Sequence, residues 1–410
     1  MTWPEQRLGR IARLRVSNVD KLTRDGEHPV RLCNYVDVYK NSAVTGDLDF
    51  MEATATTAQI SAFRLTAGDT VFTKDSETAD DIGVPAYVAE TSDDLVCGYH
   101  LAIATPDRSV VDPRFLFWAM SSTRLREQWT VLASGVTRVG LRSDDMTKAS
   151  VPVPPLEEQR RIADFLDTET DRLDQLSAAF RRQTAATNCH LHAIVRSRTW
   201  FDVEVTPHPL RRYITRMKTG STPASDGPDY SATEEGMNWL APGSILDRLE
   251  VGEPARRLDP AAVRDRAVPR FEADSVIVVG IGATAGRVAY LPAAASGNQQ
   301  LTAISTGPHL RPRFLAWQLW ARSDELRALA PFTTLPILSN DYLRSVAVKV
   351  PSLEEQRRAV AHVDAESERV AGLGALWKRA DLLLAERRQA LVTAAVTGRL
   401  DVTTARGGDK

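Results

Sequence analysis

The 410-residue sequence has few cysteines, no long apolar run and no excess of charge of either sign. Its three cysteines, Cys33, Cys97 and Cys189, are far apart and form no Cys-x-x-Cys spacing, which argues against a disulfide scaffold and against a structural zinc site. No stretch of about 18 uninterrupted apolar residues occurs, and the first residues lack the apolar core of a signal peptide. We therefore expect a cytoplasmic protein without a membrane segment.

The charge is nearly balanced, with 51 Lys and Arg against 53 Asp and Glu, a formal net charge of -2. A strongly basic chain would point to nucleic acid, whereas this composition is neutral on that question. The 43% hydrophobic and 25% charged residues are typical of a globular chain, and the length predicts two or three domains rather than one.

Recognisable catalytic patterns are lacking as well. No Ser, Cys or His lies in a nucleophile setting such as Gly-x-Ser-x-Gly. The glycine-rich string at 279–286 has neither the dinucleotide fingerprint nor Gly-Lys-Ser/Thr, and a strand pattern follows it, which favours a β-hairpin over a nucleotide loop. Cys189 and His192 are spaced i, i+3 but have no second ligand pair nearby, so a metal site is disfavoured. We expect no catalytic residues and no metal ligands.

The sequence does contain an internal repeat. The segment Val-Pro-Pro-Leu-Glu-Glu-Gln-Arg-Arg at 153–161 returns at 350–358 with Ser in place of the second Pro. Upstream of each copy, Pro-Arg-Phe-Leu-Phe-Trp at 113–118 returns as Pro-Arg-Phe-Leu-Ala-Trp at 312–317. The chain is therefore a tandem duplication of roughly half its length.

Each copy of Leu-Glu-Glu-Gln predicts the start of a long amphipathic helix. Prolines precede both starts, and Ser352 with Glu355 forms a capping-box pattern. Apolar residues then recur at three- and four-residue spacing, so that each helix could approach ~60 Å. The two apolar stripes predict an antiparallel, mutually packed spacer. The positions expected to pack there or to contact partner subunits are Leu156, Gln159, Ile162, Leu166, Leu173, Leu353, Gln356, Val363, Val370 and Trp377.

Gln159 and Gln356 could serve helix docking or subunit contact, or be ordinary first-turn polar residues. The segments before the helices are mixed, with strands expected at 69–73 and 274–279 and helices at 114–128 and 313–329. The expected fold class is α+β: two pseudo-repeated mixed α/β domains joined by two long antiparallel helices that form a coiled-coil-like spacer. The expected boundaries are 1–152, 153–200, 201–349 and 350–402, with a disordered tail at 403–410.

Polar loops in both halves suit contact with nucleic acid. Lys and Arg bind phosphate, Asn and Gln bond adenine bidentately, and hydroxyls serve either role. Each loop alone fits a solvated turn better, but their occurrence in two related domains favours DNA binding. The candidate DNA-binding residues are Lys74, Ser76, Tyr99, His100, Thr137 and Arg138 in the first half, and Lys218, Thr219, Ser221, Arg287, Asn298, Gln299 and Thr334 in the second.

The repeated Pro-x-Leu-Glu-Glu-Gln-Arg helix starts, Lys-Asp-Ser-Glu at 74–77 and Glu-Arg-Arg-Gln-Ala-Leu-Val-Thr-Ala-Ala-Val-Thr-Gly at 386–398 carry a family resemblance. Over nearly its whole length the chain resembles the specificity subunits of type I restriction-modification systems, in which target-recognition domains alternate with long helices. One departure is the end of the first helix, where residues 187–195 form a degenerate version of the 386–398 ending.

The resemblance implies that each recognition domain reads one half of a bipartite, asymmetric target in double-stranded DNA, and that the helices fix the length of the unread spacer. It implies partnership with two modification (methyltransferase) subunits, which use S-adenosylmethionine to methylate adenine. Restriction (translocase and nuclease) subunits would add ATP and magnesium, while this chain would hold no cofactor and perform no bond chemistry. Acidic spacer helices would then offset basic recognition loops in the net charge.

Two other functions fit parts of the sequence. A tandem adaptor would assemble partners through its helices without reading DNA. A nucleotide-binding enzyme would instead use the glycines between Gly280 and Gly286.

Overall fold

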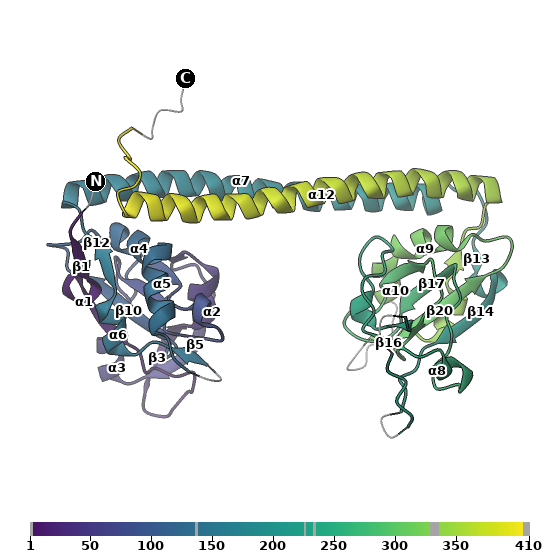
Figure 1. Cartoon of the computed structure of the whole chain (residues 1–410), viewed down its shortest axis with the longest axis horizontal. Coiled ribbons are helices and arrows are strands. Elements are labelled where there is room, and N and C mark those ends of the chain that lie inside the picture. The colour runs from purple at the N-terminus through teal and green to yellow at the C-terminus, as the bar shows by residue number, and fades with distance from the viewer. Residues whose placement is uncertain (1–2, 136–137, 225–226, 233–234, 329–335, 405–410) are drawn as a thin grey trace. The chain divides into compact units, whose positions relative to one another are not determined.

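The computed structural model describes residues 3–135, 138–224, 227–232, 235–328 and 336–404, and the chain divides into two compact units. Unit 1 comprises residues 1–179 and 379–410, and unit 2 comprises residues 180–378. Each unit therefore combines one globular half of the sequence with parts of both long helices (Figure 1).

Unit 1 is built on a mixed five-stranded sheet. Its strand order is β2 (Ala12–Val16), β10 (Leu101–Pro106), β6 (Thr70–Thr73), β8 (Pro85–Val88) and β4 (Ala43–Val44). A three-stranded sheet has the order β5 (Met51–Ala55), β3 (His28–Cys33) and β9 (Leu95–Cys97). Two short ladders pair β1 (Glu5–Arg7) with β12 (Ser150–Pro152) and β7 (Asp75–Ser76) with β11 (Val139–Gly140). The strand expected at 69–73 is confirmed as β6, which is buried throughout.

Short helices cover these sheets in unit 1. They are α1 (Leu8–Ile11), α2 (Tyr35–Lys40), α3 (Thr57–Phe63), α4 (Pro113–Ser121), α5 (Thr123–Leu132) and α6 (Ser143–Lys148). The expectation of one helix over 114–128 is wrong, because Ser122 has extended backbone angles and separates α4 from α5. In the core, Trp129 of α5 stacks on Phe72 of β6 with 5.0 Å between ring centroids.

Unit 2 repeats this topology. Its main sheet has the order β14 (Ile214–Thr219), β20 (Leu301–Thr306), β17 (Ser275–Val279) and β18 (Val288–Leu291), and a second sheet has the order β16 (Arg256–Leu258), β15 (Met237–Leu240) and β19 (Ser296–Gly297). Strand β13 (His208–Pro209) pairs with β21 (Ala347–Val348) as β1 does with β12. Strands β17 and β18 pair antiparallel, which confirms the β-hairpin expected around the glycine-rich string.

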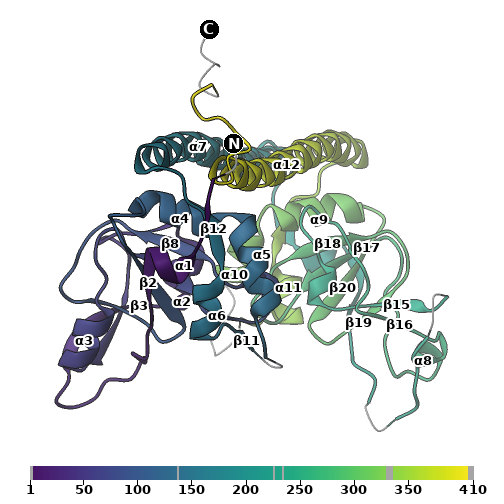
Figure 2. The same cartoon turned by 60° about the vertical axis from the view of Figure 1, so that its left-hand side comes forward.

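The helices of unit 2 also correspond to those of unit 1. They are α8 (Ala261–Arg264), α9 (Pro312–Trp320), α10 (Ser323–Ala328) and α11 (Asn340–Ser345), and Figure 2 shows α9 and α10 beside the main sheet of their unit. The helix expected at 313–329 is likewise two helices. The buried aromatic side chains Phe314 and Trp317 of α9 fill the core, as Phe115 and Trp118 of α4 do in unit 1.

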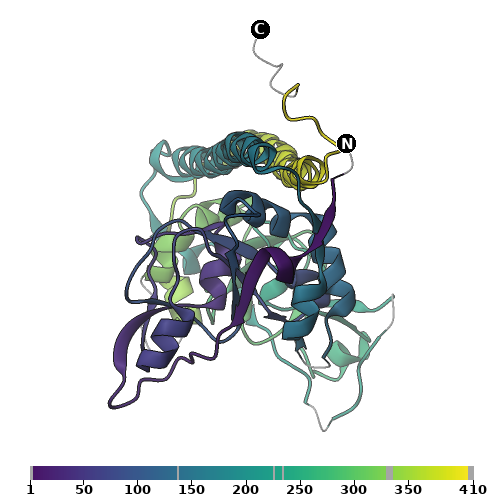
Figure 3. The same ribbon diagram turned by 90° about the vertical axis from the view of Figure 1, so that its left-hand side faces the viewer.

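The two long helices are α7 (Leu156–Arg196) and α12 (Leu353–Val396). A π-helical turn, Ser197–Phe201, follows α7. The capping box expected at Ser352 is present, since its backbone N–H donates to the Glu355 carboxylate at 2.9 Å and its hydroxyl accepts from the Glu355 backbone N–H at 3.3 Å. Within unit 1 the first part of α7 lies antiparallel to the last part of α12, and Arg388 faces Asp174 at 3.7 Å. The two helices lie side by side in Figures 1 and 3, as the repeated sequence predicted.

The helices do not explain the net charge. Helix α7 carries seven acidic and six basic residues, and α12 carries seven of each. The expectation of acidic helices that offset basic loops is therefore wrong, because the intervening Arg residues balance the glutamates and aspartates turn by turn. Among the described residues, no helix is long and apolar enough to span a membrane.

Candidate nucleic-acid interface

In unit 1 a cluster of charged side chains surrounds Asp75. The Oδ2 atom of Asp75 accepts from Lys74 Nζ at 2.6 Å and lies 2.9 Å from His100 Nδ1. The other ring nitrogen of His100, Nε2, lies 3.1 Å from a terminal nitrogen of Arg138. Three of the sequence-predicted residues, Lys74, His100 and Arg138, therefore meet around a carboxylate that the sequence analysis did not select.

The backbone places this cluster where several segments converge. Lys74 and Asp75 follow the buried strand β6, and the backbone N–H of Lys74 donates to the carbonyl of His100 at 3.1 Å. Asp75 then pairs with Gly140 in the β7–β11 ladder. Arg138 immediately precedes β11 and is exposed, while Lys74, Asp75 and His100 are half-buried.

The other first-half candidates occupy different environments. Ser76 is buried, with its hydroxyl 3.4 Å from Asp81, so its selection as a DNA contact is not supported by its position. The half-buried ring of Tyr99 lies against that of His100, at 3.8 Å between centroids. Thr137 lies outside the described residues.

In unit 2 a cluster of neutral polar side chains surrounds Asn340. Asn340 Nδ2 donates to the hydroxyl of Thr219 at 2.9 Å, and the hydroxyl of Thr302 donates to Asn340 Oδ1 at 3.2 Å. The hydroxyl groups of Thr219 and Thr302 are 3.1 Å apart. Thr219 was predicted from the sequence, whereas Asn340 and Thr302 were not.

Two amide pairs lie beside this triad. Asn298 Nδ2 donates to Gln300 Oε1 at 3.0 Å, and the exposed Gln299 accepts from the hydroxyl of Thr222 at 2.8 Å. Asn298 itself is buried, so of these amides Gln299 is the better placed for an external ligand.

Three further candidates of unit 2 are engaged with backbone carbonyls. Lys218 Nζ donates to the carbonyl of Arg270 at 3.2 Å, and the hydroxyl of Ser221 donates to that of Ala267 at 2.9 Å. Arg287 is exposed in the β17–β18 hairpin, and one of its terminal nitrogens donates to the carbonyl of Ile245 at 3.4 Å. Thr334 lies outside the described residues.

The helix glutamines dock each long helix onto its own unit. Gln159 is fully buried; its Oε1 accepts from the backbone N–H of Asp112 at 2.7 Å, and its Nε2 donates to the carbonyls of Val110 and Pro154. Gln356 makes the same three bonds with Arg311, His309 and Pro351.

Most of the helix residues that were expected either to pack within the chain or to contact partner subunits are buried within the chain. Gln159 and Gln356 dock the helices and are neither subunit contacts nor ordinary surface residues. The same burial removes five apolar candidates from any external surface, namely Ile162, Leu166, Leu173, Val363 and Val370. Leu156 and Trp377 are half-buried, and Leu353 is 41% exposed.

The end of α7, residues 187–195, packs against the globular part of unit 2 although its sequence is a degenerate version of the end of α12. Repeat spacing matches His192 with Gln389, and Val195 with Val392. Gln389 binds the α4–α5 junction of unit 1 through the carbonyl of Ser121, whereas His192 stacks on Trp320 of α9 with 3.9 Å between centroids. Both valines are buried. Half-burial of His192 lowers its pKa, which favours the neutral ring that stacks on Trp320.

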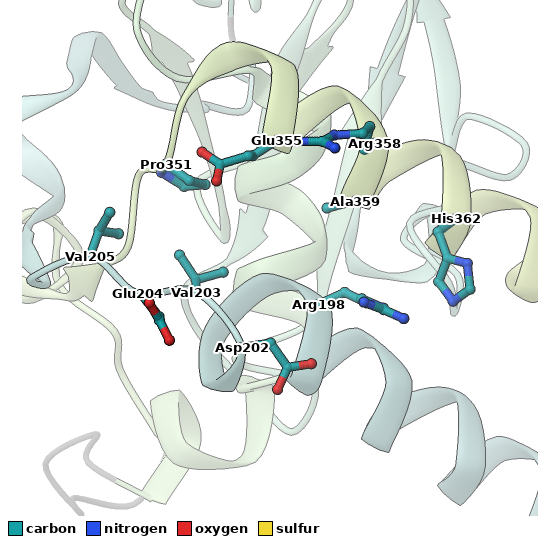
Figure 4. Close-up of a pocket in the computed structure, with 10 residues that line it drawn as sticks. All are labelled: Arg198, Asp202, Val203, Glu204, Val205, Pro351, Glu355, Arg358, Ala359 and His362. Carbon is teal, nitrogen blue, oxygen red and sulfur yellow. The ribbon is translucent and has the colours of Figure 1, made fainter.

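The larger hollows do not resemble a catalytic site. A hollow of about 520 Å³ in unit 2, between the end of α7 and the start of α12, is shown in Figure 4. Its charged lining is mixed on both sides: Arg198, Asp202 and Glu204 come from the end of α7 and the residues that follow it, and Glu355, Arg358 and His362 come from α12. Within the described ranges, no group of three His, Cys, Asp or Glu side chains could hold a metal ion.

Comparisons with known proteins agree with this arrangement. The family model of the type I restriction modification DNA specificity domain matches residues 33–179 and 269–367. A chain from a study of complex assembly and conformational transition of the type I restriction-modification system has 18% identity and a TM-score of 0.73, with 97% of this chain and 98% of that chain covered. The HsdS subunit from Thermoanaerobacter tengcongensis has 19% identity and a TM-score of 0.50, with 97% of each chain covered. The chain thus belongs to the family of type I restriction-modification DNA specificity domains.

Proposed function

We propose that this chain reads a bipartite, asymmetric DNA target, with one half-site for each unit. The observation that carries the proposal is the duplicated topology, in which each unit has its own polar cluster. The side chains differ, since Lys74, His100 and Arg138 stand in one unit and Thr219 and Asn340 in the other. Different donors in the two units favour two different half-sites and hence an asymmetric target.

The long helices would fix the spacing between the half-sites and dock the catalytic partners. In the part of α12 that belongs to unit 1, the adjacent Leu382 and Leu383 are 61% and 53% exposed. They would offer apolar contacts to a modification subunit. The similarity to a chain studied for assembly of a type I system supports partnership of this kind.

In this proposal all bond chemistry belongs to the partners. Two modification subunits would bind S-adenosylmethionine and methylate adenine, and restriction subunits would use ATP and magnesium. This chain would contribute sequence recognition and geometry. The adaptor alternative lacks a reason for the duplicated polar clusters, and the nucleotide-binding alternative lacks a phosphate loop, because the glycines lie in a β-hairpin.

The test is a genome-wide map of methylated adenine in cells that express this chain with its modification subunit, against cells with the modification subunit alone. A split motif with a constant gap is expected only with both chains. A continuous palindrome, or no new methylation despite complex formation, counts against the proposal. Affinity of the complex for DNA that does not change with salt would favour the adaptor.

A further inference from the structure

The charged cluster of unit 1 has an internal order that its bond partners define. The ionised Asp75 carboxylate can only accept, so His100 Nδ1 carries a proton and donates to Asp75 Oδ2 at 2.9 Å. A terminal nitrogen of Arg138 lies 3.1 Å from the other ring nitrogen, Nε2, and 3.5 Å from Nδ1. Asp75 also accepts from Lys74. One carboxylate therefore fixes the tautomer and orientation of His100 and, through His100, the position of the Arg138 side chain.

Gly140 provides an independent sign that the chain makes room for this carboxylate. It lies opposite Asp75 in the β7–β11 ladder. A Cβ atom at this position would lie 2.9 Å from Asp75 Oδ1, closer than such contacts allow. A larger residue at position 140 would therefore require the Asp75 carboxylate to shift from the position it has in this cluster.

The equivalent place in unit 2 lacks these charges. Gly280 donates to the carbonyl of Gln300 as Lys74 does to that of His100, and Leu338 donates to Gly280 as Leu141 does to Lys74. This matching places Ile281 at the position of Asp75, and Ile281 bridges to Ile337 as Asp75 pairs with Gly140. Unit 2 forms the same local backbone pairing without the charged cluster, so the shared fold does not require these charges.

We propose that Asp75 is a positioning residue that directs Arg138 at a guanine in the half-site of unit 1; this inference rests on the proposed function. A guanidinium held at a fixed angle donates bidentately to guanine O6 and N7, the commonest specific contact in the major groove. In unit 2 the apolar Ile281 stands at the position of Asp75, so unit 2 should read its half-site without such a contact.

The experiment uses the full chain assembled with its modification subunits and a duplex that carries the methylation motif found for the wild type. Each guanine of the unit 1 half-site is replaced in turn by 7-deazaguanine, which removes the N7 acceptor. At one position the wild-type complex should lose about tenfold in affinity. Asp75→Asn and Arg138→Lys should bind the unmodified duplex about tenfold more weakly and show little further loss with 7-deazaguanine.

Two controls separate recognition from folding. Asp93→Asn makes the same carboxylate-to-amide change at an exposed site of unit 1 and should leave the 7-deazaguanine effect intact. Arg138 is exposed, so Arg138→Lys should assemble normally even if Asp75→Asn does not. A full 7-deazaguanine effect in the Arg138→Lys complex, or a unit 1 half-site without any guanine, would overturn the inference while leaving the proposed function in place. Absence of sequence-specific binding by the wild-type complex would overturn both.

Discussion

Trp317 donates its indole N–H to Asp364 at 2.7 Å, and this bond joins the globular part of unit 2 to its long helix. Arg313 binds the same carboxylate at 2.8 Å. Unit 1 contains the same arrangement, in which Trp118 and Arg114 both donate to Asp167. In each unit the repeated Pro-Arg-Phe-Leu-x-Trp segment therefore docks on the aspartate that follows Leu-Glu-Glu-Gln on the long helix.

Loss of this carboxylate should destabilise the unit that contains it. In Asp364→Ala the indole and guanidinium groups lose their acceptor, and we expect a cost of about 1 to 3 kcal/mol in the free energy of unfolding of unit 2. Denaturant unfolding of the full chain measures it. The control Glu354→Ala removes an exposed partner of Arg357 and should change stability by less than about 0.5 kcal/mol. Equal effects of the two substitutions would contradict the account.

The buried helix glutamines should matter more than exposed ones on the same helix. Gln159→Ala leaves the N–H of Asp112 and the carbonyls of Val110 and Pro154 without their partner, so we expect a loss of about 3 kcal/mol. Gln175→Ala is the matched control, because Gln175 lies exposed on α7. The thermal midpoint of the chain should fall clearly for the first variant and hardly for the second; similar midpoints would show that Gln159 does not dock the helix.

Gly83 should be intolerant of a side chain for two separable reasons. Its φ of 77° is strained for alanine, and an added Cβ would lie 2.3 Å from the Trp129 ring. Gly26 has a similar φ of 85° with open space around it. We therefore expect Gly26→Ala to cost about 1 kcal/mol and Gly83→Ala at least about 1 kcal/mol more, by denaturant unfolding. Equal costs would mean that the Trp129 contact is not tight.

The ion pair between Arg31 and Asp94 gives a pH-dependent prediction. The hydrogen bonds from Arg31 and then from Ser92 hold the pKa of Asp94 well below its usual range. Since the pKa is lowered in the folded state, any stabilisation is present above the unfolded value of about 3.9 and is lost as the pH falls from there. In Arg31→Met the pKa of Asp94 should rise toward its ordinary value, as followed by NMR of the carboxyl carbon. Arg64→Met, which removes the partner of Asp93, should leave it unchanged.

Much of the fold was predictable because it depends on local pattern. The β-branched run before Gly280 predicted β17, and the capping box at Ser352 predicted the start of α12. The repeat predicted that both halves share a topology. Periodicity could not show the break at Ser122, because apolar residues continue on both sides of it and only the extended backbone angles there separate the helices.

The interface was less predictable because its order depends on contacts between distant segments. Lys74, His100 and Arg138 were selected by residue type, whereas Asp75, which binds both Lys74 and His100, was not selected. Alignment of His100 with Gln300 through the repeat is a signal that could have exposed the difference between the two units. Asn340, which bonds Thr219 across more than a hundred residues of sequence, left no local signal.

The central claim is that each unit reads one half of a split target. Its most direct test is a map of methylated adenine in cells that express, with the same modification subunit, a chain in which residues 1–150 come from a relative of different specificity. The account predicts that one half of the motif changes while the other half and the gap stay the same. A change in both halves, or a change in the half assigned to unit 2 alone, would contradict it.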